Sequence, residues 1–130
     1  MEKTVIGIDV GGTNLRGALV TPEGRILKQL RIASDADDGI EAVVGNLARL
    51  VNELSREGEV SGVGVGIAGV IDSKAGVITQ APNIAKVVNY PIRDNLVNKL
   101  GSNIRVAIEN DANCAALGEW WMGAGKDAAS

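Results

Sequence analysis

The fold of this chain is decided by the stretch Ile8-Asp9-Val10-Gly11-Gly12-Thr13-Asn14-Leu15-Arg16-Gly17, where an apolar run ends in a carboxylate and two glycines follow. Glycines let a backbone approach phosphate oxygens, and the N–H groups of a tight turn form a concavity that binds anions. Asp9 is a candidate for binding Mg²⁺ through its water shell, because this ion prefers oxygen ligands and retains several waters. A β-hairpin whose turn needs Gly11 and Gly12 explains the same residues, and the two interpretations are compatible.

The composition is that of one domain with an aliphatic core. Hydrophobic residues make up 45% of the 130 residues, which suffices for a buried core. The aromatic residues are only Tyr90, Trp120 and Trp121, so Val, Ile, Leu and Ala must fill that core. The net charge of −3 and the scattered basic residues argue against a nucleic-acid partner.

Several kinds of site and location are excluded by what the sequence lacks. The chain has no histidine, so neither a catalytic triad nor a His-bound metal site can form within these residues, and the single Cys114 cannot form an internal disulfide. No secretory signal opens the chain. Its longest uncharged run, Val60–Ile71, is too short and too rich in glycine to span a bilayer. We expect a cytoplasmic protein with no membrane partner.

Local patterns predict a fold that opens with three antiparallel strands. These cover Thr4–Val10, Leu15–Val20 and Arg25–Ile32, and a Pro/Gly turn separates the second from the third. Acidic residues at 35–38 favour a helix start, and apolar residues at helical spacing continue from Ile40 to Leu54.

The second half of the chain predicts alternating strands and helices. The expected elements are a strand at Val60–Ile67, a short hairpin whose far arm is Val77–Thr79, a helix at Pro91–Leu100, a strand at Ile104–Ile108 and a helix from about Asp111 to Met122. A meander followed by crossovers predicts an α/β fold with one mixed five-stranded sheet. Because the chain stops directly after its last helix, we expect it to be a truncated piece.

The stretch Gly64-Val65-Gly66-Ile67-Ala68-Gly69 matches the dinucleotide-binding fingerprint G-x-G-x-x-G and follows a predicted strand. That fingerprint requires a helix that opens at its third glycine. Here the turn Asp72–Gly76 follows, with no helical stripe. We therefore reject a dinucleotide site. These glycines instead permit a close approach of the backbone to a ligand or to a neighbouring segment.

Two later motifs carry polar side chains. Asn83, which follows a proline, is either an ordinary turn residue or an amide that offers a donor and an acceptor to a sugar hydroxyl. Glu109-Asn110-Asp111-Ala112-Asn113 follows a buried strand, at the sheet edge where ligands of open α/β sheets bind. Asp111 is either a helix N-cap or a general base that accepts a hydroxyl proton in phosphoryl transfer. An N-cap does not explain the two asparagines that flank it.

Taken together, these motifs resemble the amino-terminal lobe of the ROK sugar kinases, a family of the hexokinase/actin-like ATPase superfamily that includes bacterial glucokinases. The motifs are the phosphate hairpin, Gly66-Ile67-Ala68-Gly69, Pro82-Asn83 and Glu109–Asn113, and they occur in the family's order and approximate spacing. The resemblance covers nearly the whole chain. It implies a ribonuclease H-like, actin-like ATPase lobe, with residues 1–130 as the first of two lobes.

The resemblance also implies roles for particular residues. The residues expected to bind the phosphates of Mg-ATP are Asp9, Gly11, Gly12, Thr13 and Asn14, with Asp9 on the metal through water. The residues expected to bind the sugar are Gly69, Asn83, Asn110 and Asp111, and Asp111 is the expected catalytic base.

The chain departs from the family pattern at two places. Ala68 stands where the family often has proline, and Ala85-Lys86-Val87 stands where a Pro-Gly-Trp run follows the asparagine. We therefore expect a reshaped sugar-facing loop.

The family's second phosphate loop, adenosine pocket, further sugar-binding residues and cysteine-rich zinc signature lie beyond the position of Ser130. Structural Zn²⁺ is thus expected only in a missing second lobe.

The expected activity is ATP- and Mg²⁺-dependent phosphorylation of a hexose, first of all glucose, at its 6-hydroxyl. The resemblance places such a glucokinase in glycolysis, as a homodimer when full length, and implies that the fragment alone is inactive. Fructose and N-acetylated hexosamines remain alternative substrates, and polyphosphate an alternative donor. A non-catalytic ROK-type sugar sensor would carry a DNA-binding helix-turn-helix ahead of this lobe. The first predicted strand begins at Thr4 and leaves no room for one, so we expect an enzyme and not a sensor. A structural ATPase of the actin type is a further alternative. Asn83 and the pair Asn110-Asp111 favour a sugar pocket over the site of such an ATPase.

Overall fold

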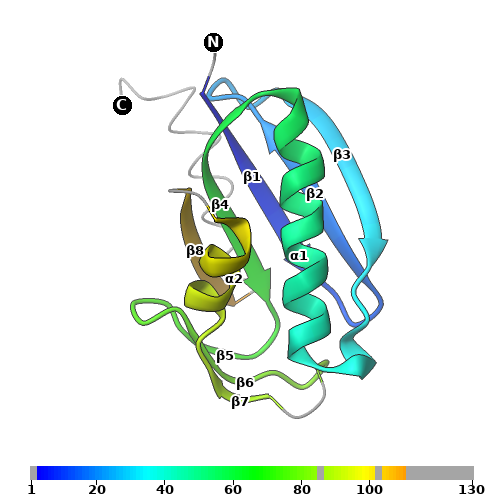
Figure 1. The fold of residues 1–130 in the computed structure, drawn as a ribbon, viewed down its shortest axis with the longest axis vertical. Helices are drawn as coiled ribbons and strands as arrows, with labels where there is room; N and C mark the ends of the chain where they lie inside the picture. The colour runs from blue at the N-terminus through cyan, green and yellow to red at the C-terminus, as the bar shows by residue number, and fades with distance from the viewer. Residues whose placement is uncertain (1–2, 85–86, 102–103, 111–130) are drawn as a thin grey trace.

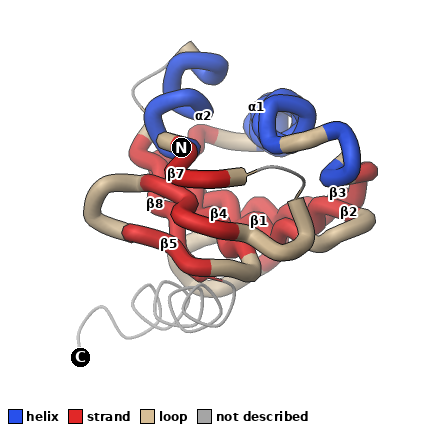
Figure 2. Tube along the Cα trace, turned by 90° about the horizontal axis from the view of Figure 1, so that it is seen from below, coloured by secondary structure: helices blue, strands red, loops and turns tan. Residues whose placement is uncertain are grey.

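In the part of the chain that the structure describes, a five-stranded mixed sheet carries two helices on one of its faces (Figures 1 and 2). The computed structural model describes residues 3–84, 87–101 and 104–110. The strands are β1 (Lys3–Val10), β2 (Asn14–Val20), β3 (Ile26–Ala33), β4 (Glu59–Ile67) and β8 (Arg105–Asn110), in the order β3-β2-β1-β4-β8. β2 is antiparallel to both of its neighbours, whereas β1, β4 and β8 are parallel. The predicted α/β sheet is confirmed.

The helix-covered face of the sheet holds the core. Successive side chains of a strand point to opposite faces, and Ile8 of β1 pairs with Gly17 of β2 on the face covered by α1 (Ile40–Leu54). A Cβ on Gly17 would lie 2.9 Å from Leu54 Cδ1 and 3.0 Å from Leu50 Cδ2, so α1 packs directly on β2. The largest fully buried side chains include Ile6, Leu15, Leu19, Leu47, Ile67 and Ile108. This core is aliphatic, as the composition predicts.

The start of α1 differs from the prediction. The acidic residues at 35–38 do not open the helix: Ala36–Asp38 form a separate 3-10 turn, and α1 begins only at Ile40. The side chain of the buried Asn46 donates to three oxygens of segment 33–35, at 2.9–3.2 Å. These bonds satisfy polar groups of segment 33–35, which is not helical. The helix α1 therefore begins later in the chain than the acidic residues at 35–38 predict.

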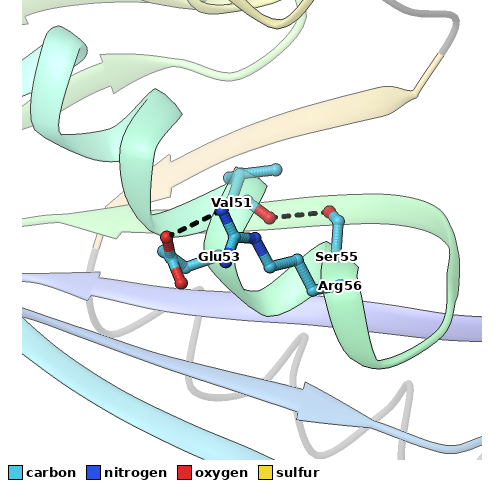
Figure 3. Close-up of polar contacts among 4 residues, drawn as sticks. All are labelled: Val51, Glu53, Ser55 and Arg56. Atoms are coloured by element: carbon cyan, nitrogen blue, oxygen red, sulfur yellow. Dashed lines mark hydrogen bonds and ion pairs between the residues drawn. The ribbon is translucent and has the colours of Figure 1, made fainter.

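The end of α1 is held by local polar contacts (Figure 3). Ser55 Oγ donates to the Val51 carbonyl oxygen at 2.6 Å, and Arg56 Nη2 lies 3.6 Å from Glu53 Oε1. The Ser55 hydroxyl is a second donor to this carbonyl oxygen, which also accepts from the Ser55 N–H, whereas an exposed ion pair contributes little. α1 ends at Leu54, and a 3-10 turn over Ser55–Glu57 followed by Gly58 leads into β4.

A second, three-stranded sheet in the described chain carries the predicted hairpin, beyond the end of β4 (Figure 1). Its strands are β5 (Val70–Asp72), β6 (Val77–Gln80) and β7 (Val88–Tyr90). β5 begins at Val70, directly after Gly69, so the helix that a dinucleotide site needs does not occur there. The strand β7, which is three residues long and contains Asn89 at a φ of 49°, was not predicted from the sequence.

The helix α2 (Ile92–Leu100) follows as predicted and leads to β8. Pro91 precedes its first turn, and the N–H of Gly101 donates to the Val97 carbonyl oxygen at 3.0 Å, which caps the helix. The helix predicted from Asp111 to Met122 lies outside the described residues. Within the described ranges, no helix has both the length and the apolar character needed to cross a membrane.

Candidate functional site

Three parallel strands bring the predicted site residues to one edge of the main sheet. Val10, Ile67 and Asn110, the last residues of β1, β4 and β8, lie side by side in register. The predicted phosphate turn, the segment with Gly69 and the predicted base Asp111 follow these three strand ends in the sequence. Ligands of open α/β sheets bind at the carboxyl edge of the strands, so the topology brings the described candidates to the edge where a ligand is expected.

The predicted phosphate turn is the hairpin turn between β1 and β2. The Gly11 N–H donates to the Asn14 carbonyl oxygen at 2.8 Å, and a Cβ on Gly11 would lie 3.0 Å from the same oxygen. Gly12 and Thr13, at the tip, are exposed. The Ser34 N–H donates to the Thr13 carbonyl oxygen at 2.9 Å and fixes the tip against the segment before α1. The hairpin is confirmed, while phosphate binding by the same turn stays a prediction.

Asp9 stands one residue before the end of β1, with an exposed side chain. Its ladder partner on β2 is Arg16. Within the described residues, no group of three or more His, Cys, Asp or Glu side chains could hold a metal ion by itself. One exposed carboxylate beside a phosphate turn does fit Mg²⁺, because this ion is usually held by one or two carboxylates, several waters and the substrate phosphates.

Asn83 lies against the tip of the phosphate turn. A Cβ built on Gly12 would lie 3.7 Å from both Cβ and Cγ of Asn83. Asn83 is exposed and belongs to a turn in which the Ile84 N–H donates to the Ala81 carbonyl oxygen at 3.3 Å. Ala81 and Ile84 are buried and anchor this turn. Asn83 is therefore a turn residue, and it also presents an amide beside the phosphate turn.

Gly69 fixes the path of the chain from β4 into the hairpin. Its φ is 146°, and a Cβ there would overlap the Gln80 carbonyl oxygen and lie 3.0 Å from the Ala81 Cα. This backbone region strongly favours glycine. The two arms of the hairpin thus touch at their base, directly before Pro82-Asn83. Of the two predicted uses of this glycine, close approach to a neighbouring segment is present, and sugar binding stays a prediction.

The far end of the same hairpin is fastened to β8 and α2. Ser73 Oγ donates to Glu109 Oε2 at 2.7 Å. Arg93 of α2 donates to the carbonyl oxygens of residues 74 and 75, at 3.1 and 3.2 Å. Glu109 directly precedes Asn110, so the hairpin that leads to Asn83 is tied to the strand that carries a second sugar-binding candidate. These roles of Ser73 and Arg93 were not predictable from the sequence, because only the fold brings the two residues together with their partners.

The end of β8 is the last described part of the site. Asn110 is half-buried there and has a polar partner of its own. Asp111, the predicted base and sugar ligand, lies outside the described residues, as do Asn113, Cys114 and the two tryptophans.

Comparison with known proteins assigns the family. A model described as "ROK family" matches residues 5–130. The chain belongs to the ROK family. This ROK chain is 38% identical over 122 residues to the glucokinase of Thermotoga maritima, an alignment that covers 94% of the chain and 38% of that enzyme. It is 35% identical over 123 residues to the beta-glucoside kinase of Listeria innocua, covering 95% of the chain and 40% of that enzyme.

A solved structure agrees with the fold of the ROK chain. The ROK family glucokinase from Streptomyces griseus, in complex with glucose and AMPPNP, superposes with a TM-score of 0.80 at 36% identity, over 95% of this chain and 38% of that one. The predicted ROK family and the predicted actin-like ATPase fold are thus confirmed. The chain spans 38–40% of the length of these relatives.

Proposed function

We propose that the whole protein transfers the γ-phosphoryl group of ATP to the 6-hydroxyl of a hexose, with glucose as the first substrate to test. The observation that carries the proposal is the position of Asn83 beside Gly12, where a Cβ added to the glycine would lie 3.7 Å from Asn83 Cβ. It places a group suited to sugar hydroxyls against a turn suited to phosphates, at the carboxyl edge of the sheet. The Thermotoga maritima relative is a glucokinase, and the Streptomyces griseus relative binds glucose and AMPPNP, which supports this pair of substrates.

The residues of this chain would act mainly by positioning. The O6 oxygen of the sugar attacks the γ-phosphorus, a new O–P bond forms, the bond to the β-phosphate oxygen breaks, and ADP leaves. In the proposal Asp111 accepts the proton from O6, while Asn83 and Asn110 hold sugar hydroxyls so that O6 lies in line with the breaking bond. Positioning of this kind supplies much of the rate enhancement in phosphoryl transfer.

The turn from Gly11 to Asn14 would hold the donor. Its N–H groups and the Thr13 hydroxyl are suited to phosphate oxygens. Mg²⁺, when bound, neutralises charge on the phosphates, and Asp9 would hold it through water. Residues 1–130 form the first of two lobes in this proposal, so the fragment alone would be inactive. Closure of the two lobes would exclude water, which otherwise competes with the sugar for the phosphoryl group.

The test is ADP release from MgATP by the full-length protein with glucose, a β-glucoside, fructose, N-acetylglucosamine and N-acetylmannosamine. The expected result is sugar-dependent turnover with the highest kcat/KM for glucose. Turnover that needs no sugar would favour an ATPase, and sugar binding without turnover would favour a sensor. A higher kcat/KM for another sugar would correct the substrate alone. Inorganic polyphosphate in place of ATP identifies the donor.

The role of Asp111 is tested separately by Asp111→Asn. General base catalysis contributes about 10²–10⁴-fold to rates, so we expect the variant to bind the sugar but to lose turnover by that order. Turnover like that of the wild type would overturn the assignment of the base. The control is Asp94→Asn, which makes the same change at an exposed position of α2.

A further inference from the structure

Two arginines and an aspartate form a row across three strands, on the sheet face that α1 does not cover. Asp9 on β1 pairs with Arg16 on β2, and Arg16 pairs with Arg31 on β3. Residues that pair across strands point to the same face. Gly17, which follows Arg16, faces α1, so the row faces away from it. All three side chains of the row are exposed.

The row lies immediately beside the phosphate turn. Asp9 is separated from Gly11 by a single residue, and Arg16 lies directly across the ladder from Asp9. Neighbouring strands are about 4.8 Å apart. The row therefore runs from beside the turn Gly11–Thr13 across β2 to β3, one strand spacing at each step.

The row carries more positive charge than its own carboxylate balances. Side chains directly opposite in an antiparallel pair have Cβ atoms about 4.5–5.5 Å apart, and like charges at such positions destabilise the sheet. Arg16 and Arg31 are such a pair. Within the described ranges neither arginine forms an ion pair, whereas Arg56 pairs with Glu53 at the end of α1. A polyanion bound from solution would offset this repulsion.

We propose that Arg16 and Arg31 bind the phosphate chain of the phosphoryl donor and so extend the donor site beyond the turn Gly11–Thr13. The inference rests on the proposed kinase function and adds two residues to it. A guanidinium group is planar, always charged and matches phosphate oxygens with two parallel N–H donors. Arg16 lies nearer to the turn than Arg31, so its loss has the larger effect.

The chemistry that this row recognises is a chain of linked phosphates. A nucleoside triphosphate and inorganic tripolyphosphate share this chain, and only the first carries a base and a ribose. Contacts of the two arginines with phosphates alone thus affect both ligands equally. Contacts with the nucleoside would affect ATP and leave tripolyphosphate unchanged.

The first experiment is steady-state kinetics of the full-length protein with Arg16→Ala, Arg31→Ala and the control Arg56→Ala. All three changes remove one exposed positive charge, and Arg56 lies outside the site. Hydrogen bonds to charged groups contribute about 1.5–3 kcal/mol, so we expect the KM for MgATP to rise about ten- to one hundred-fold for Arg16→Ala, and the KM for the hexose to change little. Values of KM equal to those of Arg56→Ala would overturn the proposal.

The second experiment does not depend on hexose phosphorylation. The affinity of the wild type for magnesium tripolyphosphate and for MgADP is measured by calorimetry, beside the same three variants. Equal losses of affinity for both ligands in Arg16→Ala and Arg31→Ala support the row as a phosphate site, even if no sugar is turned over. A loss confined to MgADP would overturn it, because the arginines would then contact the nucleoside. Undiminished binding of tripolyphosphate in the double variant would overturn it as well.

Discussion

The side chain of Asn83 lies beside Gly12: a Cβ added at this glycine would lie 3.7 Å from the Cβ and Cγ atoms of the asparagine. That distance is ordinary van der Waals contact. The space between this turn of the main sheet and the hairpin that follows β4 would hold a methyl group but not a bulky side chain. Gly12 therefore sets how closely the proposed sugar ligand approaches the proposed phosphate turn.

Replacing Asn83 by alanine should weaken hexose binding. The variant loses an amide that donates and accepts, and one hydrogen bond contributes about 0.5–1.5 kcal/mol, so the KM for the hexose should rise about two- to ten-fold. The buried anchors Ala81 and Ile84 keep the turn in place. Asn98→Ala removes the same group from the exposed side of α2. Equal KM values in the two variants would show that Asn83 serves only as a turn residue.

Replacing Gly69 by alanine should destabilise the protein and disturb the hairpin. A residue held at an unfavourable φ costs about 1–3 kcal/mol, and the added Cβ would also overlap the Gln80 carbonyl oxygen. The urea midpoint of the full-length protein should fall, and the KM for the hexose should rise because Asn83 follows the displaced segment.

The matched control for that change is Gly45→Ala. Gly45 lies within α1, and a Cβ there would have no atom within 4 Å. Alanine in a helix interior is more stable than glycine by about 0.5–1 kcal/mol, so this variant should raise the urea midpoint. The two glycine substitutions are thus expected to have opposite signs. A fall of similar size in both would mean that the Gly69 backbone is not the cause.

The main elements of the fold were predictable because local patterns determine them. The apolar stripe of α1, the β-branched run of β1 and the turn residues between β2 and β3 each specify structure within a few residues. The strand β7 was not predictable in this way. It is short, its Val88 is exposed, and its strand conformation is seen in its antiparallel pairing with β6.

The candidate site was predictable only as a set of motifs. The sequence indicated that Gly69 permits a close approach, but the group approached, the Gln80 carbonyl oxygen, is defined by the return of the hairpin. The pairing of Arg16 with both Asp9 and Arg31 depends on strand register. Register follows from which face of each strand is buried, and this information is distributed over the whole sheet.

Replacing Ser73 by alanine should loosen the hairpin at its far end. The change removes the hydrogen bond to Glu109 Oε2, and a bond to a charged group contributes about 1.5–3 kcal/mol. We expect the KM for the hexose to rise more than the KM for MgATP, since the hairpin leads to Asn83. Ser73→Thr keeps the hydroxyl and should restore the wild-type value.

Ser55→Ala is the control for Ser73→Ala. Ser55 Oγ donates to the Val51 carbonyl oxygen at 2.6 Å at the end of α1 (Figure 3), so this variant also loses one serine hydrogen bond, away from the site. Both variants should unfold at lower urea concentration than the wild type. If Ser73→Ala and Ser55→Ala changed the KM for the hexose equally, Ser73 would contribute only to the stability of the protein and not to the position of the hairpin.

Tyr90 connects β7 to α1 through a hydrogen bond, since its hydroxyl donates to Glu41 Oε1 at 2.8 Å. Burial raises the pKa of Tyr90 well above its usual value, and the hydrogen bond to Glu41 and the charge of that carboxylate raise it further. The folded state therefore holds the phenol proton more tightly than the unfolded state does. The resulting stabilisation is complete below the ordinary pKa of tyrosine, about 10, and is lost as the pH rises above it.

Replacing Tyr90 by phenylalanine should remove this alkaline dependence. We expect the free energy of unfolding of the wild type to fall more steeply between about pH 9 and about pH 11 than that of Tyr90→Phe, because only the wild type has a phenol that ionises more easily when unfolded. Deprotonation of lysines affects both proteins alike. Glu41→Gln keeps an acceptor but removes the charge, so its loss of stability should level off at a lower pH than that of the wild type. Parallel curves for the wild type and Tyr90→Phe, measured by urea unfolding, would show that the Tyr90 hydroxyl does not couple folding to pH.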